Sequence, residues 1–262
     1  MEEKKSFVEN SQVAIKGTIN GIIGNILYEF ILSLFFTMLI SVFVAATNQG
    51  VTSDEFNSLT NNIFDSYPFG LIISCLVSCV TIGVFIYLIK WEKFKQLIKN
   101  SLNKKTLKYG CIGLLCIIGF SIIYNSSVAY IFKLDDSGNS NQENVIGLIK
   151  SNLALGFLSV VILAPIAEEL TYRYCLFGGV YKKNKRLAYV IAALVFMFMH
   201  SISSFLTYGF TKNLLTEFLY LPPYLFSGLV LCYVYDKSDS LGSSAVAHML
   251  NNFVSFLAVA ML

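Results

Sequence analysis

Apolar residues occur along this chain in long uninterrupted stretches, which short polar segments separate. The stretches cover residues 22–47, 69–89, 109–132, 152–176, 187–207, 213–235 and 240–262. Each holds about 20 residues or more, the length at which a helix crosses the hydrocarbon core of a bilayer. The pattern therefore predicts an all-α integral membrane protein, a polytopic bundle of about seven transmembrane helices.

The composition supports this class and argues against others. Hydrophobic residues make up 55% of the chain and charged residues 13%, whereas an average soluble domain has about 25% charged residues. The net charge is only +3, and the lysines lie in a few short loops, so we expect no nucleic-acid partner. The first stretch is longer than the apolar part of a cleavable signal peptide, about 7–15 residues, and we expect it to be retained.

The charges between the stretches predict how the chain crosses the membrane. Segments 90–108 and 182–186 are rich in lysine and arginine, as is the N-terminal arm, whereas segment 48–68 contains acidic residues and no basic one. Loops on the cytoplasmic side carry the excess of basic residues. We therefore expect a multi-pass protein of the cell membrane with a cytoplasmic N-terminus, and alternation then puts the C-terminus outside.

Two segments carry further local predictions. Pro222 and Pro223 lie inside the sixth stretch and should kink or break its helix, because proline removes a backbone donor. Segment 90–108 is either an amphipathic helix at the cytoplasmic interface or a solvated basic loop. We divide the chain into an N-terminal three-span region, residues 1–150, which contains this basic loop, and a region 151–262 of the same bundle.

Several ionisable or amide side chains lie inside apolar stretches. An ionisable group within a membrane helix costs several kcal/mol unless it is paired, so such residues are functional candidates. The first stretch holds Glu29, and the others are Glu168, Glu169 and Arg173 in the fourth stretch, His200 in the fifth, and His248 and Asn252 in the seventh.

Helical spacing separates these groups into pairs and single residues. Glu169 and Arg173 are four residues apart with the acid first, the favourable order for an ion pair. Glu168 lies about 100° around the helix from Glu169, so it is free to face a cavity. His248 and Asn252 share a helix face. A purely structural role, as hydrogen bonds between helices, is the alternative for each histidine.

Three motifs resemble those of a known family when they are taken together and in order. They are Glu-Glu-x-x-x-Arg from Glu168 to Arg173, Phe-x-x-x-His from Phe196 to His200, and His-x-x-x-Asn from His248 to Asn252. This arrangement resembles the CPBP family, also called the Abi or CAAX protease and bacteriocin-processing family, which includes the Ras-converting CAAX endopeptidases. The resemblance covers about residues 150–255 and implies that region 151–262 is the catalytic core of a membrane peptidase, with a cavity open to the cytoplasmic side.

Peptide hydrolysis in a membrane requires a base that activates water and donors that stabilise the oxyanion. We expect Glu168 to be the base for a water held jointly with His200, and His248 with Asn252 to be the oxyanion donors. Glu169 and Arg173 would orient these side chains.

The mechanism that we prefer uses no cofactor. Zn²⁺ held by Glu168, His200 and His248 is the alternative, because catalytic zinc takes three such ligands and a water. A compact zinc motif such as His-Glu-x-x-His is not present, and zinc would leave Asn252 without a clear task.

The expected function is therefore an intramembrane endopeptidase whose partners are the lipid bilayer and a peptide or membrane-protein substrate. A non-proteolytic membrane scaffold, or an immunity or regulatory protein of the same family, is the main alternative, because a fold does not fix an activity. A small transporter that uses Glu29 and the Glu168 pair as ion sites is a third possibility.

Overall fold

The computed structural model describes residues 52–64, 66–101, 103–133, 140–208 and 214–261, with parts of 35–50; for 202–216 it describes no side chains. Within these residues all regular secondary structure is helical. The helices are α3 (Ser53–Phe64), α4 (Tyr67–Ile89), α5 (Trp91–Ser101), α6 (Lys104–Phe132), α7 (Ser140–Ser151), α8 (Leu153–Gly156), the π-helix η1 (Phe157–Leu163), α9 (Ala164–Glu168), the π-helix η2 (Glu169–Phe177), α10 (Gly178–Tyr181), α11 (Lys185–Tyr208), α12 (Leu214–Leu219), α13 (Leu221–Ser238) and α14 (Leu241–Ala260).

Five helical segments within the described residues are long and apolar enough to cross a membrane. They are Tyr67–Ile89, Lys104–Phe132, Leu153–Tyr181, Glu217–Ser238 and Leu241–Ala260. They cover the second, third, fourth, sixth and seventh predicted stretches. The fifth is the helix α11, which is not among these five, and most of the first lies outside the described residues. The all-helical membrane architecture is therefore confirmed, and the count of about seven spans stays a prediction.

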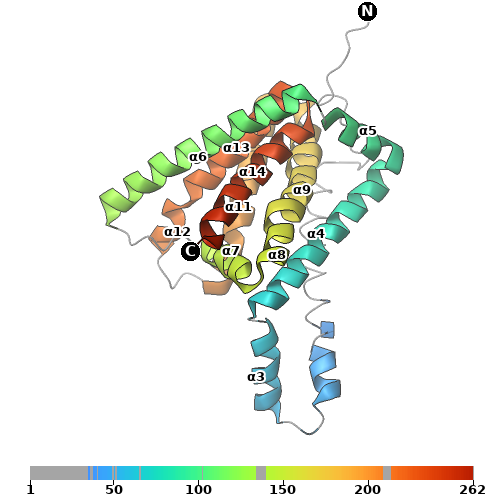
Figure 1. The fold of residues 1–262 in the computed structure, drawn as a ribbon, viewed down its shortest axis with the longest axis vertical. Helices are drawn as coiled ribbons and strands as arrows, with labels where there is room; N and C mark the ends of the chain where they lie inside the picture. The colour runs from blue at the N-terminus through green and yellow to red at the C-terminus, as the bar shows by residue number, and fades with distance from the viewer. Residues whose placement is uncertain are drawn as a thin grey trace, which may run out of the picture.

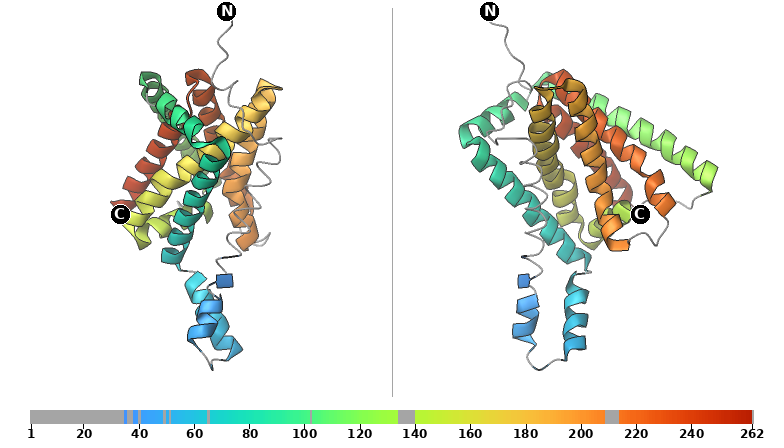
Figure 2. Two further views of the ribbon diagram at one scale, coloured as in Figure 1. Left: turned by 90° about the vertical axis from the view of Figure 1, so that its right-hand side faces the viewer. Right: turned by 180° about the vertical axis from the view of Figure 1, so that it is seen from behind.

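The segment Leu153–Tyr181 forms one continuous rod from α8 to α10, and it lies within the bundle beside α11, α13 and α14 (Figure 1). Helix α4 packs on α9 and η1 at one edge of the bundle, and α6 packs on α13 and α14. Helix α3 extends beyond the bundle, at the end opposite to α5 (Figures 1 and 2). The rod therefore has neighbouring helices on several sides, which bring side chains from distant parts of the sequence to it.

The two basic loops that the sequence predicts to be cytoplasmic, 90–108 and 182–186, lie at one end of the bundle together with the connection between α13 and α14 (Figure 1). The backbone N–H of Gly242 donates to Ser101 Oγ at 3.1 Å, and the hydroxyls of Thr106 and Ser240 are 3.1 Å apart. Lys185 pairs with Asp236 at 2.7 Å. These contacts join the ends of α5 and α13 to the starts of α6, α11 and α14.

Small residues let the central helices approach closely. A side-chain carbon added at Gly228 of α13 would lie 2.9 Å from the Cα of Ala193 in α11. Apolar helices in a membrane associate by such close packing, because lipid offers no hydrophobic gain on association. The buried core lies where α11 and α13 meet the rod, around Leu170, Phe177 and Leu231.

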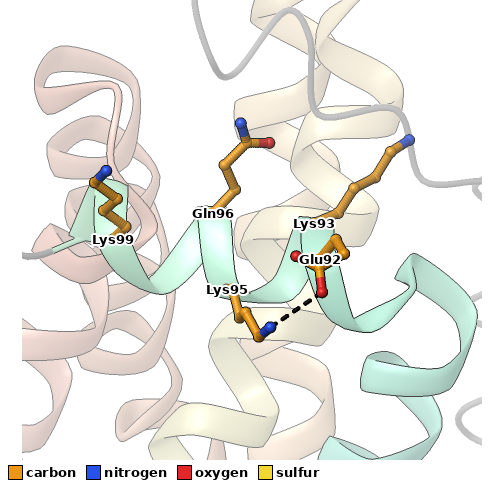
Figure 3. Close-up of a pocket in the computed structure, with 5 residues that line it drawn as sticks. All are labelled: Glu92, Lys93, Lys95, Gln96 and Lys99. Atoms are coloured by element: carbon orange, nitrogen blue, oxygen red, sulfur yellow. Dashed lines mark hydrogen bonds and ion pairs between the residues drawn. The ribbon is translucent and has the colours of Figure 1, made fainter.

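The helical alternative for segment 90–108 is confirmed for α5. Leu97 is buried, whereas Lys95 and Lys99 are exposed, which agrees with an amphipathic helix. Figure 3 shows Lys95 pointing to Glu92, at 3.0 Å, while Lys93 and Gln96 extend from the other side of α5. The shallow hollow of about 310 Å³ along these side chains is lined by α5 alone. It is a feature of the helix surface and not a cleft between helices.

The break in the sixth stretch also follows the prediction. Helix α12 ends at Leu219, and α13 begins at Leu221 with Pro222 and Pro223 in its first turn. Proline is tolerated there because the first N–H groups of a helix have no partner within that helix. The break positions Tyr224 at the start of α13, where its ring stacks on His200 with 5.0 Å between ring centroids.

Candidate functional site

The rod changes its hydrogen-bond register beside Pro165. The N–H of Ala164 donates to the carbonyl of Ser159, five residues earlier, which is the π-helical register. The next donor in that register would be residue 165, but proline has no N–H. The carbonyl of Val160 is therefore left without its backbone donor. The amide Nδ2 of Asn252, on α14, donates to this carbonyl at 2.9 Å and takes that donor's place.

The second π-helical segment, η2, contains the predicted ion pair. Arg173 Nη1 lies 3.2 Å from Glu169 Oε1, and the two side chains are 0% and 1% exposed, which confirms the pairing predicted from their spacing. The guanidinium carbon also lies 4.5 Å from the ring centroid of Phe196 on α11. A charged pair that is fully buried needs such additional partners, because water cannot solvate it.

His248 is connected to the same carboxylate. Its Nδ1 lies 3.0 Å from Glu169 Oε1, and the residue is buried on α14. A carboxylate that is paired with an arginine is ionised and can only accept, so Nδ1 of His248 carries a proton. Glu169 therefore links the rod to α14 and orients the His248 ring.

His200 is oriented by its own helix. Its Nδ1 lies 2.8 Å from the carbonyl oxygen of Phe196. A carbonyl only accepts, so Nδ1 of His200 is also the protonated nitrogen. In the neutral ring the other nitrogen, Nε2, then has a free lone pair.

Glu168 lies between the two histidines. Its Oε2 is 3.8 Å from Nε2 of His200 and 3.9 Å from Nε2 of His248. Within the described residues, Oε2 makes no hydrogen bond. Three acceptor atoms thus face one another, and they need a shared proton or a donating water between them.

Glu168 also lines a cavity of about 300 Å³ between α4 and the rod. Its side chain is 28% exposed, in contrast to Glu169 at 1%. The expectation that the two adjacent acids face different surroundings, and that Glu168 faces a cavity, is therefore correct.

The structure brings five of the six predicted site residues into one connected group. Glu168, Glu169, Arg173, His200 and His248 are linked by the contacts above. Asn252 is bound to Val160 instead. The catalytic roles of all six stay predictions, and Glu29 lies outside the described residues.

Among the described side chains, no three His, Cys, Asp or Glu residues form a group that could hold a metal ion. The alternative zinc ligands Glu168, His200 and His248 are neighbours, but they do not form a preorganised ligand set in this geometry. The protonated Nδ1 atoms are compatible with both the metal-free and the zinc mechanism, since histidine ligands of metals are oriented by the same kind of hydrogen bond.

A polar cluster at the end of the rod was not predicted. Asp236 accepts hydrogen bonds from Tyr181 at 2.7 Å and from Tyr189 at 2.9 Å, besides its pair with Lys185. The hydrogen bond to Asp236 raises the pKa of Lys185 above its usual value. The cluster joins α10, α11 and α13. The sequence signal was an acidic residue at the end of an apolar stretch, but its partners lie about 50 residues away in sequence.

Comparison with known proteins gives one family and several curated relatives. The model of the family described as type II CAAX prenyl endopeptidase Rce1-like matches residues 150–254. The UPF0177 protein YxdF of Lactococcus lactis subsp. lactis (strain IL1403) is 26% identical over 187 residues, which are 68% of this chain and 92% of YxdF.

Two further UPF0177 proteins of the same strain match over shorter lengths. YvdC is 32% identical over 109 residues, 38% of this chain and 41% of YvdC. YaiF is 33% identical over 121 residues, 45% of this chain and 47% of YaiF. The chain thus matches less than half of the length of these two relatives. No solved structure matches it.

Proposed function

We propose that this protein is an intramembrane endopeptidase with Glu168 as its base, since residues 150–254 match the model of the Rce1-like family of type II CAAX prenyl endopeptidases. The observation that carries the proposal is the position of Glu168 Oε2, within 3.9 Å of Nε2 of both histidines. The family and the all-helical membrane architecture support the class of reaction. The role of each residue follows from its hydrogen bonds.

The proposed role of Glu168 as a base depends on which nitrogen atoms of the neighbouring histidines carry a proton. The Nδ1 of His200 donates to the carbonyl of Phe196, so the neutral His200 ring offers an acceptor, Nε2, on the side of Glu168. A water between Glu168 and His200 would donate to both and keep its lone pair for the peptide carbonyl. Glu168 takes the water's proton during the attack and later returns it to the leaving amine.

The oxyanion site follows from the charges of the cluster. Glu168 and Glu169 carry two negative charges and Arg173 one positive charge, so one further proton makes the buried group neutral. A proton on Nε2 of His248 would supply this charge and would create a donor for the oxyanion. Glu169 stabilises that cation through Nδ1. Asn252 uses one of its two N–H groups on Val160, and the second is available as a further donor.

We propose that this chemistry uses no cofactor. Zn²⁺ bound by Glu168, His200 and His248 is the alternative, and it would take over the activation of water. In that mechanism both histidines would hold the ion through their Nε2 atoms, so His248 could not donate to the oxyanion. The two mechanisms therefore differ in what they require of His248.

The proposed substrates are peptides or membrane proteins that reach the site within the bilayer. Peptide precursors, such as bacteriocin leaders, signalling peptides or the tails of membrane proteins, are the first class to test, and prenylated CAAX peptides are the second. We propose that the basic end of the bundle, with α5, faces the cytoplasm, because its loops hold the excess of lysine and arginine.

The test uses purified protein in detergent micelles and a mass-spectrometric peptide library that includes farnesylated members. We expect the wild type to cleave some peptides and Glu168→Gln to cleave none, while it remains folded. The matched control is Glu92→Gln, a change at an exposed glutamate of α5, which should cleave as the wild type does.

A Glu168→Gln variant as active as the wild type would remove Glu168 from the mechanism. If neither protein cleaves any peptide, the non-proteolytic scaffold becomes the better explanation.

A further inference from the structure

The cavity beside Glu168 has one wall that lies outside the matched family region. That wall is α4, which lines the cavity with residues at helical spacing, including Gly70, Ser74, Ser78 and Thr81. The opposite wall belongs to the rod and includes Ala167 and Glu168. Two helix faces thus oppose each other, with small side chains among the larger Ile73, Val77 and Tyr172. The candidate base lies between these faces.

Thr81 differs from four other hydroxyl residues in the described helices of this protein. Thr171, Ser201, Ser227 and Ser238 each donate to the carbonyl four residues earlier, which is the usual way for a helix to satisfy a hydroxyl in an apolar environment. Thr81 is 2% exposed, and its Oγ1 has no hydrogen-bond partner within the described part of the chain. Thr81 lines the cavity, and its buried hydroxyl is not bonded to its own helix. Rotation of the side chain would turn this hydroxyl toward the cavity, where it could bind a ligand.

The position of α4 is fixed independently of Thr81. The hydroxyls of Ser74 on α4 and Ser159 on η1 are 2.8 Å apart, so the cavity has a wall bound to the rod. Ser78, which is also buried, lies between Ser74 and Thr81 on this wall. The wall therefore offers a row of hydroxyls along a cavity that is otherwise mostly apolar.

We infer that this cavity binds an extended, small-residue segment of the substrate main chain, with the Thr81 hydroxyl as one of its hydrogen-bond partners. An extended peptide in a membrane must have its N–H and C=O groups bonded, since lipid offers no partner for them. A hydroxyl serves either group, because it both donates and accepts. The volume of about 300 Å³ lies at the lower limit of ligand pockets, which favours glycine, alanine and serine over consecutive aromatic residues.

This inference rests on the proposed function for the role of Glu168, but its test includes binding alone. In the Glu168→Gln background we would measure the fluorescence anisotropy of two short dansyl-labelled peptides. One has alanine and glycine at its centre, and the other has phenylalanine and tryptophan there. We expect the first to bind more tightly. Thr81→Val should weaken its binding roughly five-fold, the loss expected for one hydrogen bond.

Two further variants complete the binding test: one separates the hydroxyl from the shape of residue 81, and the other is a control at an exposed threonine. Thr81→Ser keeps the hydroxyl and should bind within about two-fold of the parent, a change smaller than one hydrogen bond. Thr47→Val is the matched control, because Thr47 is exposed and donates to Phe43 in its own helix. Where the library yields a cleaved peptide, Thr81→Val should raise its KM and leave kcat within two-fold.

Equal binding by the parent and Thr81→Val, equal losses in Thr81→Val and Thr81→Ser, or preference for the aromatic peptide would each overturn the inference. These results do not depend on cleavage. An inactive wild type that still binds the alanine peptide through Thr81 would refute the proposed function and leave the binding site in place.

Discussion

The hydrogen bond between Asn252 and Val160 predicts an energetic coupling between Asn252 and Pro165. Asn252→Ala removes the side-chain donor that takes the place of the missing N–H of Pro165 at the Val160 carbonyl. The alanine in Pro165→Ala has an N–H, which can donate to that carbonyl. Asn252→Ala should therefore be less destabilising in the Pro165→Ala background than in the wild type.

The magnitude follows from the cost of an unpaired buried carbonyl, about 1–3 kcal/mol. Hydrogen bonds between membrane helices give smaller couplings, about 0.6 kcal/mol on average and about 1.7 at most. We therefore expect a coupling of about 1 kcal/mol, or roughly a five-fold difference in the unfolding equilibrium constant. The loss of asparagine packing is common to both backgrounds and cancels.

The assay is reversible unfolding of the four proteins in mixed detergent micelles, followed by far-UV circular dichroism. Ser255→Ala is the control in the same helix, because the Ser255 hydroxyl bonds to the carbonyl of Asn251 in its own helix and should show no coupling to Pro165. If the effects of Asn252→Ala and Pro165→Ala on the free energy of unfolding are additive, Asn252 does not take the place of the missing proline N–H. An equal coupling between Ser255→Ala and Pro165→Ala would refute the idea as well.

Three other predictions concern two ion pairs and the zinc alternative. Arg173→Ala leaves the Glu169 carboxylate buried without its cation and should lower the free energy of unfolding by roughly 3–5 kcal/mol; unchanged unfolding in detergent would contradict the energetic importance of the pair. Asp236→Asn should destabilise by about 1–3 kcal/mol, because the buried Asp236 side chain no longer accepts hydrogen bonds from Tyr181 and Tyr189 as a charged group, and Tm should fall more than in the exposed variant Asp54→Asn. The purified protein should contain far less than one zinc per chain and stay active after slow metal removal; activity that is lost on removal and restored by added zinc would instead support the zinc mechanism.

The sequence alone determined the features that depend on local spacing or on the solvent. Apolar stretches of bilayer length predict helices because a spanning helix satisfies its own backbone, whatever its neighbours are. The pair of Glu169 and Arg173 was predictable because both residues lie on one helix, four positions apart. The break before α13 followed from Pro222 and Pro223 for the same reason.

The tertiary structure decided what depends on contacts between helices. The sequence marked Glu168 as an acid without a local partner, but only packing brings His200 and His248 to it. Asn252 shares a helix face with His248, yet its hydrogen bond depends on a carbonyl that Pro165 leaves unpaired on another helix. Thr81 carried no signal, because a threonine in an apolar stretch normally bonds to its own helix. Periodicity reports which face of a helix a residue occupies, and it does not report which helix packs against that face.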